Sequence, residues 1–228
     1  MGLEAPLRKI AVFGAGGFGR EVAWLISEIN RVTPTHDLIG FVDDDPELKG
    51  RVVGGHAVLG GLGILGEIRD VAIAVAVGDP STRLRIAERL KAFGVLLPNL
   101  IHPSVLVGEE TSMGEGNILC AGVIITVNVR IGNFCHLNLK STVGHDCVLE
   151  DFATAACGVD LAGDVRLGQG VYLGNHATVL PSVRVGPGSV IGAGAVVNRD
   201  VRAGSVCVGV PARAIRTNPA FQSMGGPA

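Results

Sequence analysis

The sequence predicts two domains of different class: an α/β domain over residues 1–98 and an all-β solenoid over residues 99–216. Two observations carry this division. Residues 9–93 alternate apolar strands, loops with Gly or Asp, and segments of helical periodicity. From Val107 to Val197, every sixth residue is apolar without a break in phase. Residues 217–228 include Gly, Pro and polar residues, and we expect them to form a flexible tail.

Composition limits the class of protein. The chain has 228 residues, of which 47% are apolar, enough to bury a core. With a formal net charge of −2, the chain lacks the excess positive charge that is typical of proteins that bind nucleic acid or an acidic membrane. No apolar run approaches the roughly 20 residues of a membrane span, and the N-terminus lacks the order of a signal peptide. We therefore expect a cytoplasmic protein.

Five cysteines all lie in the repeat region, without CxxC spacing: Cys120, Cys135, Cys147, Cys157 and Cys207. We interpret them as small buried apolar residues rather than metal ligands or disulfides.

The first domain is expected to be Rossmann-like. The apolar runs and helical periodicities predict strands and helices in alternation, at Lys9–Phe13, Arg20–Asn30, Leu38–Val42, Val71–Val77 and Ser81–Phe93. Such βαβ units form parallel sheets that bind ligands at the carboxyl ends of their strands. The loops at these ends place six residues around one expected crevice: Gly16, Gly17, Asp43, Asp44, Gly78 and Asp79.

The loop from Gly14 to Gly19 has the spacing G-x-G-x-x-G between a strand and a helix. Its backbone N–H groups can approach a phosphate closely. About a hundred residues are too few for the double fold that holds a dinucleotide, so a mononucleotide diphosphate fits better. The alternative is that these glycines only make a tight strand-to-helix turn.

The second domain is expected to be a left-handed parallel β-helix. A period of six fits neither a helix nor a simple strand, but it fits a chain that turns a corner every six residues and closes a triangular coil every 18. The aliphatic residue would point into the prism, and a small residue two positions earlier would fit the corner. We expect the Gly that often follows the aliphatic residue to permit the turn. At the junction, His102 before Pro103 is interpreted as a structural residue.

One corner carries side chains that a turn does not need: His145 and Asp146. An imidazole beside a carboxylate suits a general base, because the carboxylate can hold one tautomer. His136 and His176 are interpreted as outward polar residues, and the spacing of the histidines does not match the zinc site of γ-class carbonic anhydrases, which share this repeat. We expect no metal.

Six motifs spread over almost the whole chain carry a family resemblance: GAGGFGRE, FVDDDPELKG, AVGDP, VGHDC, AGDVRLG and VGVPARAI. The chain resembles the bacterial nucleotide-sugar N-acetyltransferases that act on 4-amino-4,6-dideoxyhexoses, a group that includes the bacillosamine-pathway enzyme and GDP-perosamine N-acetyltransferase. The resemblance implies a homotrimer with active sites between subunits, acetyl-CoA as co-substrate, and a role in cell-surface glycan synthesis.

The resemblance also implies roles for individual residues. It makes His145 the general base, Asp146 its supporting acid, and Asn138 a contact in the reacting region. It also implies residues that contact the sugar nucleotide and residues that contact the coenzyme. For the sugar nucleotide they are Gly16, Gly17, Phe18, Asp43, Asp44 and Gly78. For the coenzyme they are Gly163, Asn175 and Pro181, together with Thr154.

Two positions depart from the family pattern. Many members read Gly-Gly-His-Gly in the first loop, whereas this chain has Phe18, which loses one polar contact. Several members have a second His nine residues after the base, where this chain has Thr154.

We expect an amine deprotonated by His145 to attack the thioester of acetyl-CoA directly, with the Gly163 N–H as a candidate oxyanion donor. Two alternatives stay open: a sialic acid-type sugar O-acetyltransferase, and a non-enzymatic nucleotide-binding trimer scaffold. The sequence does not distinguish UDP from GDP.

Overall fold

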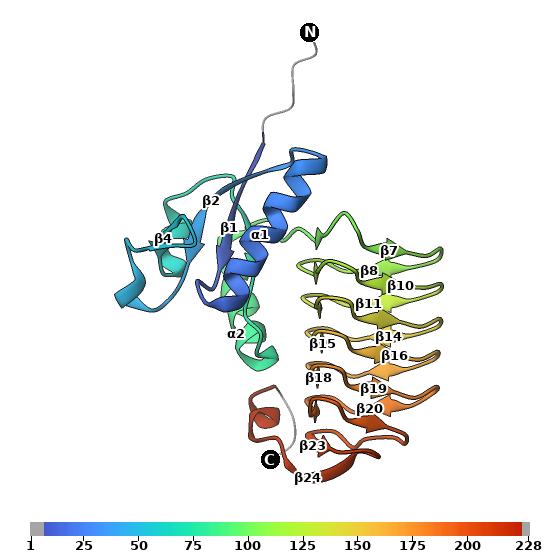
Figure 1. Cartoon of the computed structure of the whole chain (residues 1–228). Coiled ribbons are helices and arrows are strands. Elements are labelled where there is room, and N and C mark those ends of the chain that lie inside the picture. Colours follow the sequence, from blue (N-terminus) through green and yellow to red (C-terminus); the bar gives the residue numbers. More distant parts are fainter. Residues whose placement is uncertain (1–6, 225–228) are drawn as a thin grey trace.

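Parallel strand pairing builds both domains of the computed structural model, which describes residues 7–224 (Figure 1). The α/β domain contains, in order, β1 (Arg8–Phe13), α1 (Gly17–Val32), β2 (His36–Val42), η1 (Pro46–Leu48), β3 (Val52–Val53), β4 (His56–Gly60), η2 (Leu62–Gly66), β5 (Ala72–Val75), α2 (Pro80–Leu90) and η3 (Lys91–Phe93).

The sheet of this domain has the order β3-β4-β2-β1-β5, and β1, β2, β4 and β5 are parallel. The alternation of strands and helices is thus confirmed. Two strands were not predicted, β4 and the short antiparallel β3, which Gly54 and Gly55 connect as a tight hairpin. Helix α1 begins at Gly17 rather than Arg20, because the last residues of the glycine motif already form its first turn.

The second domain is a left-handed parallel β-helix of short strands. These are β6 (Leu100–Ile101), β7 (Leu106–Val107), β8 (Ser112–Met113), β9 (Ile118–Leu119), β10 (Ile124–Ile125), β11 (Arg130–Ile131), β12 (His136–Leu137), β13 (Thr142–Val143), β14 (Val148–Leu149), β15 (Thr154–Ala155), β16 (Asp160–Leu161), β17 (Arg166–Leu167), β18 (Tyr172–Leu173), β19 (Thr178–Val179), β20 (Arg184–Val185), β21 (Val190–Ile191), β22 (Val196–Val197), β23 (Ser205–Val208) and β24 (Arg213–Thr217).

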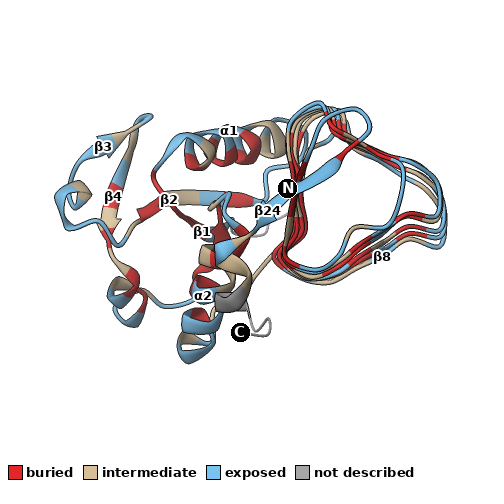
Figure 2. Cartoon of the chain, turned by 90° about the horizontal axis from the view of Figure 1, so that it is seen from below, coloured by how far each residue is buried: buried red, intermediate tan, exposed pale blue. Residues whose placement is uncertain are grey.

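Each coil stacks on the coil 18 residues further along the chain. Ile125 pairs with Val143, and Val143 pairs with Leu161. The strands of the β-helix form three sheets: the six-stranded sheet from β7 to β22, a five-stranded sheet from β8 to β20, and the eight-stranded sheet from β6 to β24. We call the second of these the five-stranded helix sheet, to distinguish it from the five-stranded sheet of the α/β domain. Figure 2 shows the resulting prism end-on, with the α/β domain along one side.

The aliphatic residue of each hexad packs in the core of the prism. Leu137, Leu149 and Leu173 are at most 1% exposed, and Cys135 and Cys147, at the small-residue position, are fully buried. Val107 is 45% exposed, because it lies in the first coil, which has no coil before it. The interpretation of the cysteines is confirmed for four of the five, since only Cys157 is partly exposed.

The turns use backbone conformation differently from our expectation. From Val107 to Ile191, the left-handed residue of each corner is the third after the inward aliphatic residue, for example Asp146 with φ +62°. The Gly directly after the aliphatic residue is needed for space instead. At Gly144, a Cβ would lie 2.7 Å from the carbonyl carbon of Ala162 in the next coil.

The α/β domain packs against the eight-stranded sheet, and the two domains share apolar clusters. Phe134 and Phe152, at successive turns of the β-helix, stack with ring centroids 5.3 Å apart. Both rings belong to the cluster that contains Ile73 of β5 and Ile86 of α2. This packing holds α2 and the loop before it close to the β-helix.

The segment from Thr217 does not fray as expected over its described part. After the hairpin of β23 and β24, η4 (Pro219–Met224) turns back toward α2 (Figure 1). The N–H of Asn218 donates to the Gly204 carbonyl at 2.6 Å, and its side chain donates to the Gly188 carbonyl at 2.8 Å. Phe221 lies against Gly188 and Gly204, where a Cβ would leave no room for its ring. Residues 225–228 of the expected tail lie outside the described residues.

Within residues 7–224, no helix has the length and apolar character needed to cross a membrane.

Candidate functional site

His145 and Asp146 lie at the corner between β13 and β14, where the six-stranded sheet meets the five-stranded helix sheet. Nδ1 of His145 is 2.6 Å from Oδ2 of Asp146, and the two side chains are 63% and 49% exposed. Asn128 of the preceding coil donates to the other oxygen, Oδ1, at 2.5 Å. The hydrogen bonds from His145 and Asn128 lower the pKa of Asp146. An ionised Asp146 selects the tautomer with the proton on Nδ1, which leaves Nε2 as the acceptor.

The imidazole of His145 lies over Gly163 of the next coil. A Cβ at Gly163 would be only 2.3 Å from Nε2 of His145, so any larger residue would displace the ring. The coils are joined here by the N–H of Asp164, which donates to the His145 carbonyl at 2.8 Å. Within the described chain, the N–H of Gly163 has no hydrogen-bond partner. A basic nitrogen and a free N–H donor therefore lie at one corner.

All the other predicted coenzyme and catalytic residues except Thr154 lie along the two edges of the six-stranded sheet. Pro181 is exposed on the corner of His145, one coil beyond Gly163. Asn138 and Asn175 lie on the opposite corner, between the eight-stranded and six-stranded sheets. Oδ1 of Asn138 accepts from the N–H of Leu139 at 2.7 Å. One chain therefore does not bring Asn138 and His145 together.

In the α/β domain, the glycines of the first loop divide into two kinds. Gly14 has φ +103°, and a Cβ at Gly19 would lie 1.8 Å from the Gly14 carbonyl oxygen, so the fold itself requires both. Gly16 and Gly17 have ordinary φ values, and a Cβ on either would meet nothing within 4 Å. The tight turn therefore explains only part of the motif, and Gly16 and Gly17 leave the start of α1 open to a ligand.

Asp43 and Asp44 both have partners within the domain. Asp43 accepts from the N–H of Ala15 at 2.8 Å and from that of Asp45 at 3.0 Å, so it ties the first two loops together. Asp44 pairs with Arg89 of α2 at 2.5 Å. The hydrogen bond from Arg89 is the main cause of the lowered pKa of Asp44.

The expected crevice is not a single pocket. Asp43 and Asp44 line one pocket, Gly78 and Asp79 line another on the other side of the start of α2, and Gly16 and Gly17 line neither of the two. One, of about 500 Å³, is lined by Phe13, Gly14, Asp43, Asp44, Val77, Thr82, Arg85, Ile86 and Arg89. The other, of about 450 Å³, is lined by Gly78, Asp79, Pro80, Ser81, Gly170, Tyr172, Val190, Asn218 and Ala220. The second pocket thus lies between α2, the eight-stranded sheet and the C-terminal segment. Arg85 and Arg89 were not among the predicted site residues.

Phe18 packs on the β-helix. Its ring centroid is 5.1 Å from that of His136, which is only 2% exposed. The interpretation of His136 as an outward polar residue was wrong, because the direction away from the prism here leads into the domain interface. His176, by contrast, is exposed.

Thr154 also lies in the domain interface. It is 6% exposed, and its hydroxyl accepts from Nη2 of Arg83 at 2.7 Å. Its strand, β15, belongs to the eight-stranded sheet, away from the corner of His145. This burial argues against the expected contact between Thr154 and the coenzyme, and Arg83 is a residue that sequence analysis did not single out.

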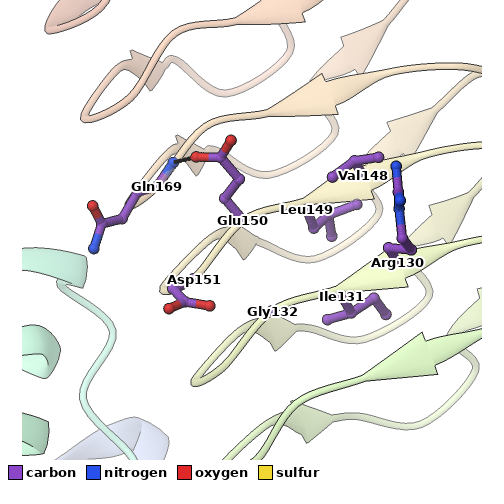
Figure 3. Close-up of a pocket in the computed structure, with 8 residues that line it drawn as sticks. All are labelled: Arg130, Ile131, Gly132, Val148, Leu149, Glu150, Asp151 and Gln169. Carbon is purple, nitrogen blue, oxygen red and sulfur yellow. Dashed lines mark hydrogen bonds between the residues drawn. The ribbon is translucent and has the colours of Figure 1, made fainter.

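A further groove of about 460 Å³ crosses the five-stranded helix sheet (Figure 3). Its lining includes Arg130, Glu150 and Asp151, and Glu150 accepts from the N–H of Gln169 at 2.9 Å. The groove is lined by none of the predicted site residues.

The histidines of the β-helix are kept apart. His136 lies in the domain interface, whereas His145 and His176 lie at different corners of the prism. Among the described residues, no group of three or more His, Cys, Asp or Glu side chains could hold a metal ion. This arrangement does not fit a three-histidine zinc site.

Both domains of the chain are similar to known protein families. Residues 9–90 match the family described as the PglD N-terminal domain, and residues 164–199 match the bacterial transferase hexapeptide (six repeats). GDP-perosamine N-acetyltransferase of Escherichia coli O157:H7 is 34% identical over 215 residues, covering 91% of this chain and 96% of that protein.

Solved structures give the same result. A mutant of perosamine N-acetyltransferase from Caulobacter crescentus, in complex with CoA and GDP-perosamine, is 31% identical with a TM-score of 0.83, covering 91% of this chain and 97% of that one. The acetyltransferase domain of PglB from Neisseria gonorrhoeae, in complex with acetyl coenzyme A, is 32% identical with a TM-score of 0.83, covering 92% and 100%. The chain therefore belongs to the hexapeptide-repeat family of N-acetyltransferases that includes GDP-perosamine N-acetyltransferase.

Proposed function

We propose that this enzyme transfers the acetyl group of acetyl-CoA to the C4 amine of a nucleotide-linked 4-amino-4,6-dideoxyhexose, with His145 as general base. The observation that carries the proposal is the corner of His145, Asp146 and Gly163, which combines an oriented acceptor nitrogen with a free N–H donor. The relatives with CoA and GDP-perosamine support the substrate class.

The proposed reaction is a direct transfer in a ternary complex. The sugar ammonium loses a proton to Nε2 of His145, and the neutral amine attacks the thioester carbonyl. The N–H of Gly163 donates to the oxyanion of the tetrahedral intermediate. The C–S bond then breaks, and the proton held by His145 passes to the leaving CoA thiolate. The acetylated nitrogen still carries two protons, so it loses one of them to the freed Nε2 of His145, from which this proton passes to solvent. Asp146 keeps Nδ1 protonated and stabilises the imidazolium that forms meanwhile.

The sugar nucleotide is proposed to bind the α/β domain. Gly16, Gly17 and Phe18 form the open first turn of α1, which has no side-chain cap and no acidic residue. Helix N-termini of this kind favour anions such as a diphosphate. Arg85 and Arg89 add positive charge to the pocket beside Asp43 and Asp44.

A homotrimer is proposed to complete the site. Asn138 and Asn175 line one edge of the six-stranded sheet, whereas His145, Gly163 and Pro181 line the other. Packing this sheet against a second copy would bring residues from the two edges together. The exposed Leu106 and Ile124, which are 62% and 40% exposed, support burial of this sheet in an assembly. The cytoplasmic location and the role in glycan synthesis stay predictions.

The test is release of CoA thiol from acetyl-CoA with UDP- and GDP-linked 4-amino-4,6-dideoxyhexoses in parallel, and with a sialic acid as the hydroxyl acceptor. We expect release with an amino sugar and a loss of about 10²- to 10⁴-fold in His145→Asn. His56→Asn, on β4 of the α/β domain and outside the lining of both pockets, is the matched control. Release only with the hydroxyl acceptor would identify an O-acetyltransferase, and no release with any acceptor would favour a binding scaffold.

A further inference from the structure

Arg83 is a fully buried cation between the two domains, with 0% exposure. It lies in α2 on the face formed with Ile86, Ala87 and Leu90. No carboxylate of the described residues forms a salt bridge with it. Burial lowers the pKa of Arg83 to about 10, which still keeps the guanidinium charged near neutral pH. A buried charge without an ionic partner is costly, so its hydrogen bonds must compensate.

These hydrogen bonds join three parts of the molecule. Nη1 donates to the carbonyls of Val77 and Gly78 at 2.8 and 3.2 Å, and it contacts Nδ1 of His136 on β12 at 3.0 Å. Nη2 donates to the Phe152 carbonyl and to the Thr154 hydroxyl, both at 2.7 Å. The guanidinium therefore links the loop after β5 to two adjacent coils of the β-helix.

The two loop carbonyls determine how the loop presents its N–H groups. In a trans peptide, the C=O and the N–H point in opposite directions. Because the carbonyls of Val77 and Gly78 turn toward Arg83, the N–H groups of Gly78 and Asp79 turn away from it. Within residues 7–224, neither N–H has a hydrogen-bond partner. The Cα of Gly78 is also open, since a Cβ there would meet nothing within 4 Å.

The loop also lines a pocket. Gly78 and Asp79 lie in the wall of the pocket of about 450 Å³ that Tyr172 and Asn218 close from the β-helix side. The carboxylate of Asp79 is already engaged, because it accepts from the Ser81 hydroxyl and from the N–H of Thr82 at 2.6 and 2.7 Å. The free donors on this stretch are therefore backbone N–H groups at fixed positions.

We propose that Arg83 is a positioning residue for the sugar-nucleotide site: it fastens the Val77–Gly78 carbonyls to β12 and β15, and so directs the N–H groups of Gly78 and Asp79 to the substrate. This inference rests on the proposed function, because it assumes that a sugar nucleotide binds this loop. It gives buried His136 and Thr154 a role through Arg83 rather than through the coenzyme.

The test compares four variants by steady-state kinetics with the active amino-sugar nucleotide and acetyl-CoA. Arg83→Lys keeps the charge but lacks the planar fork, Arg83→Gln loses the charge, and Thr154→Val removes one acceptor at nearly constant volume. Lys91→Gln, at the exposed end of the same helical segment, is the matched control.

We expect the KM for the sugar nucleotide to rise about tenfold in Arg83→Gln and about threefold to tenfold in Arg83→Lys and Thr154→Val, as for the loss of one or two hydrogen bonds. The KM for acetyl-CoA should stay within about twofold, and the control should resemble the wild type. If Arg83→Gln does not fold, the other two variants decide the question.

An effect limited to the melting temperature, or a fall in kcat with an unchanged sugar-nucleotide KM, would make Arg83 merely structural and overturn the inference. So would equal increases in both KM values. A wild-type enzyme that acetylates no amino-sugar nucleotide would instead overturn the proposed function, and this inference with it.

Discussion

The imidazole of His145 covers Gly163 of the next coil, where a Cβ would lie 2.3 Å from Nε2. Gly163 does not have a positive φ, so space rather than backbone conformation requires the glycine. The position of the proposed base thus depends on a residue 18 positions further along the chain, one complete coil away.

Gly163→Ala should therefore lower kcat through displacement of the imidazole. We expect a loss of about tenfold to 10²-fold, less than for removal of the base, because the exposed ring can move aside. For the same reason the melting temperature should change little. Gly66→Ala, where a Cβ meets nothing within 4 Å, is the control. Unchanged kcat in Gly163→Ala would mean that the observed ring position is not the catalytic one.

Asp146→Asn should isolate the contribution of the carboxylate. Asp146 has φ +62°, and Asn tolerates this left-handed conformation, so the backbone of the turn should persist. The amide of Asn has only one acceptor oxygen for two donors, Nδ1–H of His145 and the Asn128 amide, so it no longer fixes the tautomer. The developing imidazolium also loses its counter-ion. We expect kcat to fall about tenfold or more, while KM for the sugar nucleotide stays nearly constant. Asp164→Asn, at the equivalent left-handed position one coil on, provides the comparison. Equal activities of the two variants would argue against the supporting role of Asp146.

The β-helix could be predicted from the sequence because its rule is local. Each hexad repeats the same inward residue and the same corner, so a phase read at Val107 extends to Val197. His145 could be singled out for the same reason, since it interrupts a pattern that needs no imidazole. The conformational role of the turn glycines was not predicted correctly, because Gly144 is required by contact with Ala162 rather than by its own φ.

The contacts between the domains could not be predicted in this way. Arg83 meets His136 across 53 residues and Thr154 across 71, and no local pattern pairs them. One signal was present in α2, since Arg83, Ile86, Ala87 and Leu90 have the i, i+3, i+4, i+7 spacing of a buried helix face. A cation on such a face indicates a buried polar partner, but the partner becomes identifiable only when the second domain is placed.

The two kinds of glycine in the first loop predict opposite mutant behaviour. At Gly16 and Gly17 an added methyl group meets no protein atom, so Gly16→Ala and Gly17→Ala should fold normally. A methyl group there would obstruct a phosphate approaching the N–H groups, so the KM for the sugar nucleotide should rise about tenfold. Gly19→Ala should instead lower the free energy of unfolding by about 1–3 kcal/mol or more, since its Cβ would overlap the Gly14 carbonyl. Thermal melting and substrate titration separate the two effects, and an unchanged KM in both ligand-side variants would contradict a phosphate at this turn.

Stability should fall as the pH drops from neutral toward 5, because two histidines are buried. Burial, together with the nearby Arg83, lowers the pKa of His136 well below 6.5, and burial and Arg8 lower that of His36. Below pH 6.5 the unfolded chain binds protons at these imidazoles and the folded chain does not, so protonation favours unfolding. Each histidine can contribute up to about 1.4 kcal/mol per pH unit.

Urea unfolding at several pH values between 7 and 5 measures the slope of the free energy of unfolding against pH. His136→Gln keeps an oxygen that can accept from Arg83 but cannot be protonated in this range, so the slope should become shallower. His176→Gln, at an exposed corner, is the matched control and should keep the wild-type slope. The carboxylates with lowered pKa, such as Asp44, lose their contribution to the free energy of unfolding only at more acidic pH, below the ordinary aspartate pKa of 3.8. An unchanged slope in His136→Gln would therefore show that His136 is protonated without loss of the domain interface, contrary to the position of Arg83 beside it.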